Sequence, residues 1–322
     1  MTSRLRPLAT VLLFLLTAAM RGASDPVDTV MVARIREEGL QRSQVMEYEG
    51  YIADVLGARL TLSRDMSRAQ TWVQGQMKAM GLVNVAAEPF MDFGVTWDNE
   101  YVSVHLLEPD YQPMVGYPVA HTGSTQGRQV APAVIVDLLV KADLEKYRGT
   151  LRGKAVLVTP PAVVDLTPLT NGVPRLTQQD LDARERMVIA PPRVTPPRVA
   201  RHPDLLTAEE KIAFYAAEGV TAVLQCESGW LGAVRGFSRP GSRADNWSRA
   251  GMLASPAIVA ITPEHYNRMH RILTRGIPVS IEIEVRNRVG DKVEQAMNLV
   301  GEIPGSDLKD EVVMIGAHLD TW

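Results

Sequence analysis

The sequence predicts an α/β protein built on a mixed sheet. Its 322 residues include 46% hydrophobic and 22% charged side chains, proportions typical of a globular protein that buries a sizeable core. Strand and helix patterns follow one another between residues 152 and 224, an order that favours a sheet covered by helices. The near-continuous apolar run at 312–315 has the pattern of a strand that a parallel sheet buries on both faces.

Two helices are predicted in the N-terminal part of the chain. Apolar residues recur at spacings of three and four within residues 27–57, and Gly57 is placed to end that helix. The same spacing returns from Asp65 onward, and Gly81 is placed to close the second helix. The methionines of this second helix are expected to pack in a core.

Strands follow these helices. Residues 82–90 and 100–108 are predicted strands, and alternation in the second one places His105 on its more polar face. We therefore expect His105 to be a surface or hydrogen-bonded histidine. Residues 130–139 are apolar and rich in β-forming side chains, and residues 152–158 read as a turn that runs into a further strand.

Helix caps mark the middle of the chain. Asp143 can cap a short helix. Thr207-Ala-Glu-Glu210 is a capping box, which opens a helix that stops at Gly219, and residues 220–224 follow as a strand. This order predicts a small α/β or mixed unit inserted between the first strands and the C-terminal sheet.

The C-terminal part returns to regular signals. A helix is predicted over residues 262–273, because a proline stands at its first helical position. Strands are predicted over residues 279–285, 295–302 and 311–317. The last of these strands contains the apolar run and is expected to lie inside the sheet.

The first 23 residues predict an export signal. Arg4 and Arg6 precede an apolar stretch at 8–19, which ends in small residues suited to cleavage. This stretch is shorter than the roughly 20 residues that a membrane-spanning helix needs, so we expect no membrane span after cleavage. An uncleaved anchor is the alternative interpretation.

Charge and cysteine usage narrow the protein's class. The formal net charge of -3 gives no support to nucleic-acid binding, which favours a basic surplus. Cys226 is the single cysteine, so an intrachain disulfide is excluded, and we expect this thiol to be a small buried residue. Export without disulfides predicts a secreted or periplasmic bacterial protein.

Two segments leave their role open. The tandem Pro-Pro-Arg-Val at 191–194 and 196–199 is expected to be extended, either as an exposed loop or as a lid or partner-binding arm. Four arginines punctuate a stretch that contains glycine and serine, and they indicate either a solvated loop, which we favour, or an anion-binding loop. They are Arg235, Arg239, Arg243 and Arg249.

The candidate functional residues follow the last predicted strand. His318 stands at its carboxyl end, where open α/β sheets place their sites. Because residues i and i+2 of an extended chain point to the same side, Asp320 can accept a hydrogen bond from one ring nitrogen of His318 and orient the other toward a metal. The same spacing occurs at His202 and Asp204, but there it lies in a proline-containing loop, which we do not interpret as a site.

The sequence around these residues resembles a known family. Asn298-Leu-Val-Gly-Glu-Ile-Pro-Gly-Ser306 and Glu311-Val-Val-Met-Ile-Gly-Ala-His-Leu-Asp-Thr-Trp322 are similar to the opening of the catalytic core in the co-catalytic zinc exopeptidases. The similarity is greatest to the carboxypeptidase Q-like members, which carry His-Leu-Asp-Ser-Trp at this point. Thr321 replaces that serine here and keeps its hydroxyl.

The resemblance extends over almost the whole chain after the export signal. Ile52-Ala-Asp-Val-Leu-Gly-Ala-Arg-Leu-Thr61 is similar to the leading segment of these enzymes, although Leu62 stands where they often have glycine. Leu151-Arg-Gly-Lys-Ala-Val-Leu-Val158 resembles their inserted protease-associated domain, a β-rich α+β unit. The implied organisation is a signal peptide at 1–23, the N-terminal part of the peptidase domain at 24–116, the inserted domain at 117–261, and an incomplete peptidase core at 262–322.

The resemblance implies a secreted zinc metallopeptidase, an exopeptidase of the dipeptidase or carboxypeptidase kind that hydrolyses short peptides with metal-activated water. Two zinc ions are implied, with His318 as a metal ligand and Asp320 as the acid that orients it. A homodimer is compatible with this family. Whether the enzyme acts from the amino or the carboxyl end of a peptide stays open.

A second function class stays open as well. The chain fits a non-catalytic protein that binds peptides or a partner through the inserted domain. The remaining zinc ligands of the family have no match before Trp322, so we expect the 322-residue chain alone to be inactive and its last strand to expose apolar faces.

Overall fold

A computed structural model describes residues 27–164, 176–186, 202–227 and 232–322. The chain divides into two compact units, residues 1–55 and 56–322, which are considered separately. The predicted export signal and the Pro-Pro-Arg-Val repeat lie outside the described residues. Within the described part of the chain, no helix combines the length and the apolar character that crossing a membrane requires.

The described residues of the first unit are helical. Helix α2 (Thr29–Gln41) begins at Asp28, whose carboxylate accepts hydrogen bonds from the backbone N–H groups of Val30 and Met31. Helix α3 (Val45–Gly50) follows after a break, and a π-helical turn, η1 (Tyr51–Leu56), continues it. The single helix predicted over 27–57 is therefore interrupted at residues 42–44, where Arg42 turns back to form ion pairs with two glutamates of α2.

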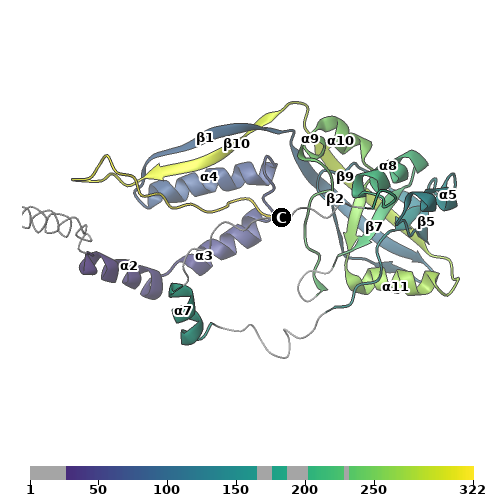
Figure 1. Cartoon of the computed structure of the whole chain (residues 1–322), viewed down its shortest axis with the longest axis horizontal. Helices are drawn as coiled ribbons and strands as arrows, with labels where there is room; N and C mark the ends of the chain where they lie inside the picture. Colours follow the sequence, from purple (N-terminus) through teal and green to yellow (C-terminus); the bar gives the residue numbers. More distant parts are fainter. Residues whose placement is uncertain (1–26, 165–175, 187–201, 228–231) are drawn as a thin grey trace, which may run out of the picture. The chain divides into compact units, whose positions relative to one another are not determined.

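The second unit opens with a helix and a long strand pair. Helix α4 (Arg64–Ala79) begins at Ser63, whose hydroxyl accepts a hydrogen bond from Met66 N–H, as the sequence predicts for this region. Strand β1 (Val83–Gly94) pairs antiparallel with β10 (Glu294–Glu302), and α4 packs along this two-stranded sheet (Figure 1).

A larger sheet of eight strands lies between β1 and β10 in the sequence. Its spatial order is β3-β2-β9-β5-β6-β7-β8-β4. Strands β5 to β8 are mutually parallel, whereas β2, β3, β9 and β4 join antiparallel, so the mixed α/β class predicted from sequence is confirmed. The strands are β2 (Trp97–Glu108), β3 (Gln112–Pro113), β4 (Gly116–Pro118), β5 (Gln129–Ile135), β6 (Ala155–Leu157), β7 (Ala222–Cys226), β8 (Ile258–Ile261) and β9 (Ser280–Val289).

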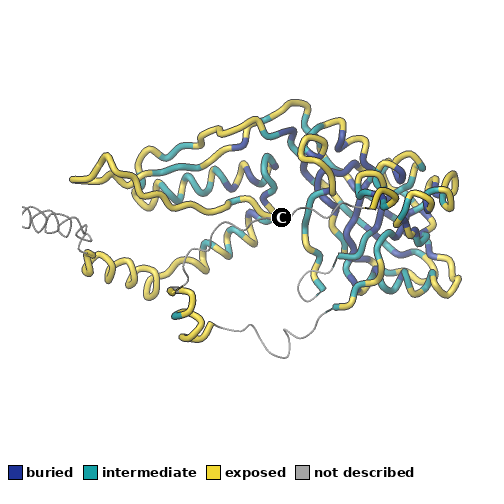
Figure 2. Tube along the Cα trace, viewed as in Figure 1, coloured by how far each residue is buried: buried dark blue, intermediate teal, exposed yellow. Residues whose placement is uncertain are grey.

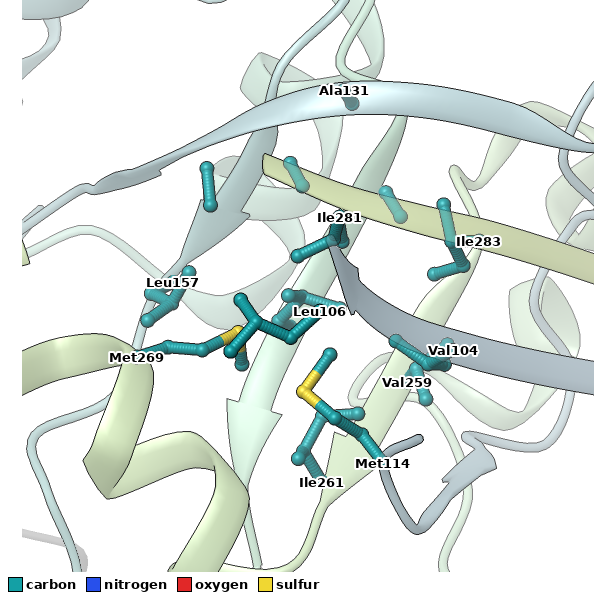
Figure 3. Close-up of a cluster of buried hydrophobic side chains, with 14 of the residues drawn as sticks. Val104, Leu106, Met114, Ala131, Leu157, Val259, Ile261, Met269, Ile281 and Ile283 are labelled. Atoms are coloured by element: carbon teal, nitrogen blue, oxygen red, sulfur yellow. The ribbon is translucent and has the colours of Figure 1, made fainter. Parts of the chain in front are cut away.

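Helices cover both faces of the parallel strands. On one face, Phe214 and Tyr215 of α8 (Ala208–Glu218) pack against Val156 and Val223. On the other, α11 (Pro263–Leu273) joins a larger cluster in which Leu106, Ile281 and Ile283 are fully buried (Figure 3). The other helical segments are η2 (Lys141–Asp143), α5 (Leu144–Tyr147), α7 (Gln178–Glu185), α9 (Arg243–Asn246) and α10 (Arg249–Ala254).

Local signals placed these helices correctly. Thr207 and Glu210 form the predicted capping box, and Gly219 ends α8 in the left-handed conformation. Asp143 stands at the start of α5, but its carboxylate accepts hydrogen bonds from the preceding backbone N–H groups of Leu139 and Val140. The buried residues gather in the eight-stranded sheet, while α2 and the C-terminal segment are exposed (Figure 2).

The eight-stranded sheet contains strands from all three segments predicted after residue 23. It contains β2 and β3 from 24–116, β5 to β8 from 117–261, and β9 from 262–322. The predicted limits of the inserted domain at 117 and 261 therefore fall within one continuous sheet. Where such a domain begins and ends stays a prediction.

Candidate functional site

The segment that leads to His318 is not a strand. Residues 311–317, predicted as a buried strand, carry no regular secondary structure, and Val313 and Ile315 are 96% and 95% exposed. This prediction was wrong because an apolar run becomes a strand only where neighbouring strands accept and donate its hydrogen bonds. Within the described residues, no strand pairs with 311–317.

His318 and Asp320 nevertheless lie together. His318 Nδ1 is 2.7 Å from Asp320 Oδ1, a short hydrogen bond of the kind that a carboxylate forms with an imidazole. With Nδ1 held by the carboxylate, Nε2 is the ring nitrogen left to face a ligand. The side chain of His318 is 92% exposed and that of Asp320 is 43% exposed, so solvent reaches this nitrogen.

A loop at the start of the second unit supports this pair. Arg59 and Thr321 form an isolated antiparallel bridge, with Arg59 N–H donating to Thr321 O at 3.0 Å and Thr321 N–H donating to Arg59 O at 3.2 Å. Thr61 Oγ1 lies 3.4 Å from Asp320 Oδ2. Sequence analysis missed Arg59, because its guanidinium group donates to Leu319 O, 260 residues away in the chain.

The donors present do not by themselves make a zinc site. Zinc in proteins is held by about three or four side chains. Among the described residues, no group of three or more His, Cys, Asp and Glu side chains is placed to hold a metal ion. His318 and Asp320 therefore fit one ligand and its orienting acid, and no step of catalysis can be derived from them alone.

The second His-x-Asp sequence differs in geometry. His202 Nδ1 lies 3.7 Å from Asp204 Oδ2 and accepts a hydrogen bond from the backbone N–H of Asp204 at 3.4 Å. The carboxylate thus does not hold this imidazole as Asp320 holds His318. Identical spacing in the sequence produces a close pair in one place and a loose one in the other.

A buried polar cluster lies elsewhere in the second unit. His121 is fully buried with φ at +63°, and its Nδ1 lies 2.6 Å from Ser238 Oγ. Burial, together with the nearby positive charge of Arg239, lowers the pKa of His121 to about 4, so this imidazole is neutral near pH 7. Its ring packs against Trp247, with 4.1 Å between the ring centroids.

Arg239 corrects the interpretation of the arginine-containing stretch as a solvated loop. It is only 5% exposed, its Nε donates to the backbone oxygen of His121 at 3.1 Å, and its Nη2 lies 2.8 Å from Asp245 Oδ2. Arg243 lies over the ring of Phe93, and Arg249 donates to the backbone oxygens at the end of β9 and at Gly290. These guanidinium groups serve packing and ion pairing within the fold.

Two other side chains singled out in the sequence have structural partners. His105 Nδ1 lies 3.3 Å from Glu282 Oε1 across β2 and β9, which confirms the expected hydrogen-bonded histidine. Cys226 is half-buried rather than fully buried, and burial raises the pKa of its thiol. A thiol with a raised pKa is a poor nucleophile near neutral pH.

Comparison with known proteins supports the resemblance. The chain is 22% identical over 283 residues to carboxypeptidase Q of Bos taurus, a match that covers 87% of this chain and 50% of the bovine protein. The corresponding values for carboxypeptidase Q of Mus musculus are 22% over 289 residues, 88% and 51%. The chain thus spans about half the length of these curated relatives. No protein-family model matches the sequence.

A solved structure shares the fold. The peptidase M28 precursor from Shewanella amazonensis SB2B superimposes with a TM-score of 0.55 at 20% identity, over 91% of this chain and 57% of that one. At this identity the likeness concerns the fold. The sequence comparison and the structure comparison therefore point to the same group of proteins. The chain resembles the co-catalytic zinc exopeptidases related to carboxypeptidase Q.

Proposed function

We propose that the protein acts as a secreted or periplasmic zinc-dependent exopeptidase that hydrolyses short peptides. The observation that carries the proposal is the 2.7 Å contact between His318 Nδ1 and Asp320 Oδ1. It occurs within the His-Leu-Asp-Thr-Trp sequence of a chain that resembles carboxypeptidase Q. The export signal predicted at residues 1–23 supports the location.

The proposed role of His318 is that of a metal ligand through Nε2. Asp320 would accept the Nδ1 proton, which fixes the tautomer of the imidazole and raises its basicity as a ligand. The further ligands that zinc requires have to come from outside the pair. The proposal therefore concerns the whole protein, and assigns to this chain one ligand and the carboxylate that orients it.

We also propose revised limits for the inserted domain, near residues 96 and 290. Gly94 pairs with Glu294 at the end of the two-stranded sheet, and Thr96 O accepts a hydrogen bond from Gly290 N–H. The chain thus leaves β1 and returns to β10 at neighbouring points, as an inserted domain requires. All of the strands described between those points, β2 to β9, belong to the eight-stranded sheet.

The test compares His318→Ala and Asp320→Asn with the unaltered protein, both as residues 24–322 and as the longest product of its gene. Zinc content and zinc affinity are measured first, followed by hydrolysis of a set of dipeptides. Asp320→Asn should lower zinc affinity about 10- to 100-fold, the usual effect of losing an orienting carboxylate. His318→Ala should lower it further.

The matched control is His202→Ala, which removes the imidazole of the loosely paired His-x-Asp sequence. It should leave zinc affinity and hydrolysis unchanged. If His318→Ala retains both, the proposed site is wrong. If no form of the protein hydrolyses peptides, the non-catalytic binding function is favoured instead.

A further inference from the structure

We infer that Arg59 is a positioning residue. It holds the backbone next to His318 and Asp320 in place, so that the side chains of these two residues stay paired. The inference rests on the proposed function of that pair. In this role Arg59 acts through the backbone of residues 319–321.

The first contact is between backbones. Arg59 and Thr321 exchange two backbone hydrogen bonds, of 3.0 and 3.2 Å, and so form a hydrogen-bonded pair of the kind found in antiparallel sheets. Such a pair fixes the extended conformation of the chain at residue 321. An extended chain places His318 and Asp320 on one side and Leu319 on the other.

The second contact comes from the guanidinium group. Arg59 Nε donates to Leu319 O at 3.0 Å, and its Nη1 donates to Gly57 O of its own loop. Leu319 is half-buried while both of its neighbours are exposed, as the alternation requires. The donor therefore holds the carbonyl group of Leu319, the residue that stands between the two functional residues.

The third contact reaches Asp320 itself. Thr61 stands two residues after Arg59, and its Oγ1 lies 3.4 Å from Asp320 Oδ2, while Asp320 Oδ1 faces His318. The two carboxylate oxygens thus have different partners, which favours one orientation of the carboxylate. Between them, Arg59 and Thr61 contact all three residues from 319 to 321.

Burial of Arg59 indicates that this arrangement is more than a surface contact. Arg59 is 9% exposed, although the segment it holds is mostly exposed. Removing a guanidinium group from water costs free energy that hydrogen bonds must offset. The comparison with His202 and Asp204, whose nearest side-chain distance is 3.7 Å rather than 2.7 Å, shows that His-x-Asp spacing alone does not close the pair.

The experiment uses the 24–322 chain, uniformly isotope-labelled so that both the Thr321 amide and the His318 ring are observed, and compares Arg59→Ala and Arg59→Lys with the unaltered protein. In Arg59→Ala, exchange of the Thr321 amide hydrogen should accelerate roughly tenfold, the factor expected for one lost hydrogen bond. The His318 ring nitrogen signals should move toward those of an unpaired histidine. Arg59→Lys keeps the positive charge without the Nε–H donor, so the His318 ring nitrogen signals should move in the same direction but by a smaller amount.

Arg64→Ala is the matched control, because Arg64 is an exposed arginine in the same region that pairs only loosely with Asp65, at 3.8 Å. It should move neither readout. If the His318 signals stay paired in both Arg59 variants, the inference is overturned. If Arg59→Ala does not fold, Arg59→Lys decides.

Zinc titration of the longest gene product separates this inference from the proposed function. Arg59→Ala should weaken zinc binding about 10- to 100-fold, as loss of a supporting contact does. If the unaltered protein binds no zinc while its His318 signals still depend on Arg59, the positioning role stands and the zinc peptidase proposal fails.

Discussion

Two segments of the second unit carry isoleucine and valine side chains but differ completely in the burial of those side chains. In β9, Ile281 and Ile283 are fully buried, whereas Val313 and Ile315 in the C-terminal segment are 96% and 95% exposed. β9 has β2 on one side and β5 on the other, so its backbone hydrogen bonds are satisfied along both edges. An apolar run is therefore only half of the information that makes a strand, and its neighbours supply the rest.

The largest expected effect comes from truncating an isoleucine to alanine in each of the two segments. Ile281→Ala should lower the free energy of unfolding by about 2 to 5 kcal/mol, because it leaves a cavity in a packed core. Ile315→Ala should change it by less than about 0.5 kcal/mol, since an exposed side chain has little to lose. Urea unfolding of the two variants measures both values.

Equal losses in the two variants would break the comparison. They would mean that residues 311–317 are covered in solution, for example by self-association. Sedimentation analysis at several protein concentrations distinguishes that outcome, because burial between copies of the chain depends on concentration.

What the sequence predicts well is local. Thr207, Glu210 and Pro263 lie within one turn of the helix ends that they predict, so short-range patterns were sufficient for α8 and α11. The pairing of His318 with Asp320 is local in the same sense, because alternation along an extended chain brings residues i and i+2 to one side. Both the helices and the pair could be found without knowing the fold.

What the sequence does not predict depends on distant partners. Arg59 meets Leu319 across 260 residues, and Arg239 meets His121 across 118. An arginine beside glycines and serines has the pattern of a surface residue, yet the fold buries Arg239 against a backbone oxygen and Asp245. The position of 311–317 is of the same kind, since it depends on strands far away in the sequence.

The next largest expected effect is a loss of stability at low pH, caused by the buried His121. His121 has its pKa lowered to about 4 by burial and by Arg239, against an ordinary value of 6.5. The unfolded chain therefore takes up this proton first, and stability falls as the pH drops from 6.5 toward 4. At pH 5 the loss due to His121 should be about 2 kcal/mol relative to pH 7.

The control is His121→Asn, because asparagine tolerates the positive φ at this position and does not titrate. Urea unfolding at pH 7 and pH 5 gives the pH-dependent loss for each protein, and the loss should be smaller in the variant by about 2 kcal/mol. An identical loss in both would show that His121 is accessible to protons in the folded state. His318, exposed in the other region, contributes nothing to this difference because both proteins retain it.

The smallest expected effect concerns the loop that supports the exposed segment. Leu62 has φ at +68° in a turn closed by a hydrogen bond from Ser63 N–H to Leu60 O, a backbone conformation that favours glycine. The left-handed conformation costs a residue with a Cβ atom about 1 to 2 kcal/mol. Leu62→Gly should therefore be more stable than Leu62→Ala by about 1 kcal/mol, although both lose the same leucine contacts.

Gly75 in α4 provides the opposite case within the same unit. It lies in a regular helix, and a Cβ atom there would meet open space, so Gly75→Ala should stabilise the protein by about 1 kcal/mol. Urea unfolding of Leu62→Gly, Leu62→Ala and Gly75→Ala measures these differences. Glycine should give the more stable protein at position 62, and alanine the more stable protein at position 75. If Leu62→Ala equals or exceeds Leu62→Gly in stability, residue 62 does not hold the left-handed turn in solution, and the loop carrying Arg59 and Thr61 is less rigid than its hydrogen bonds indicate.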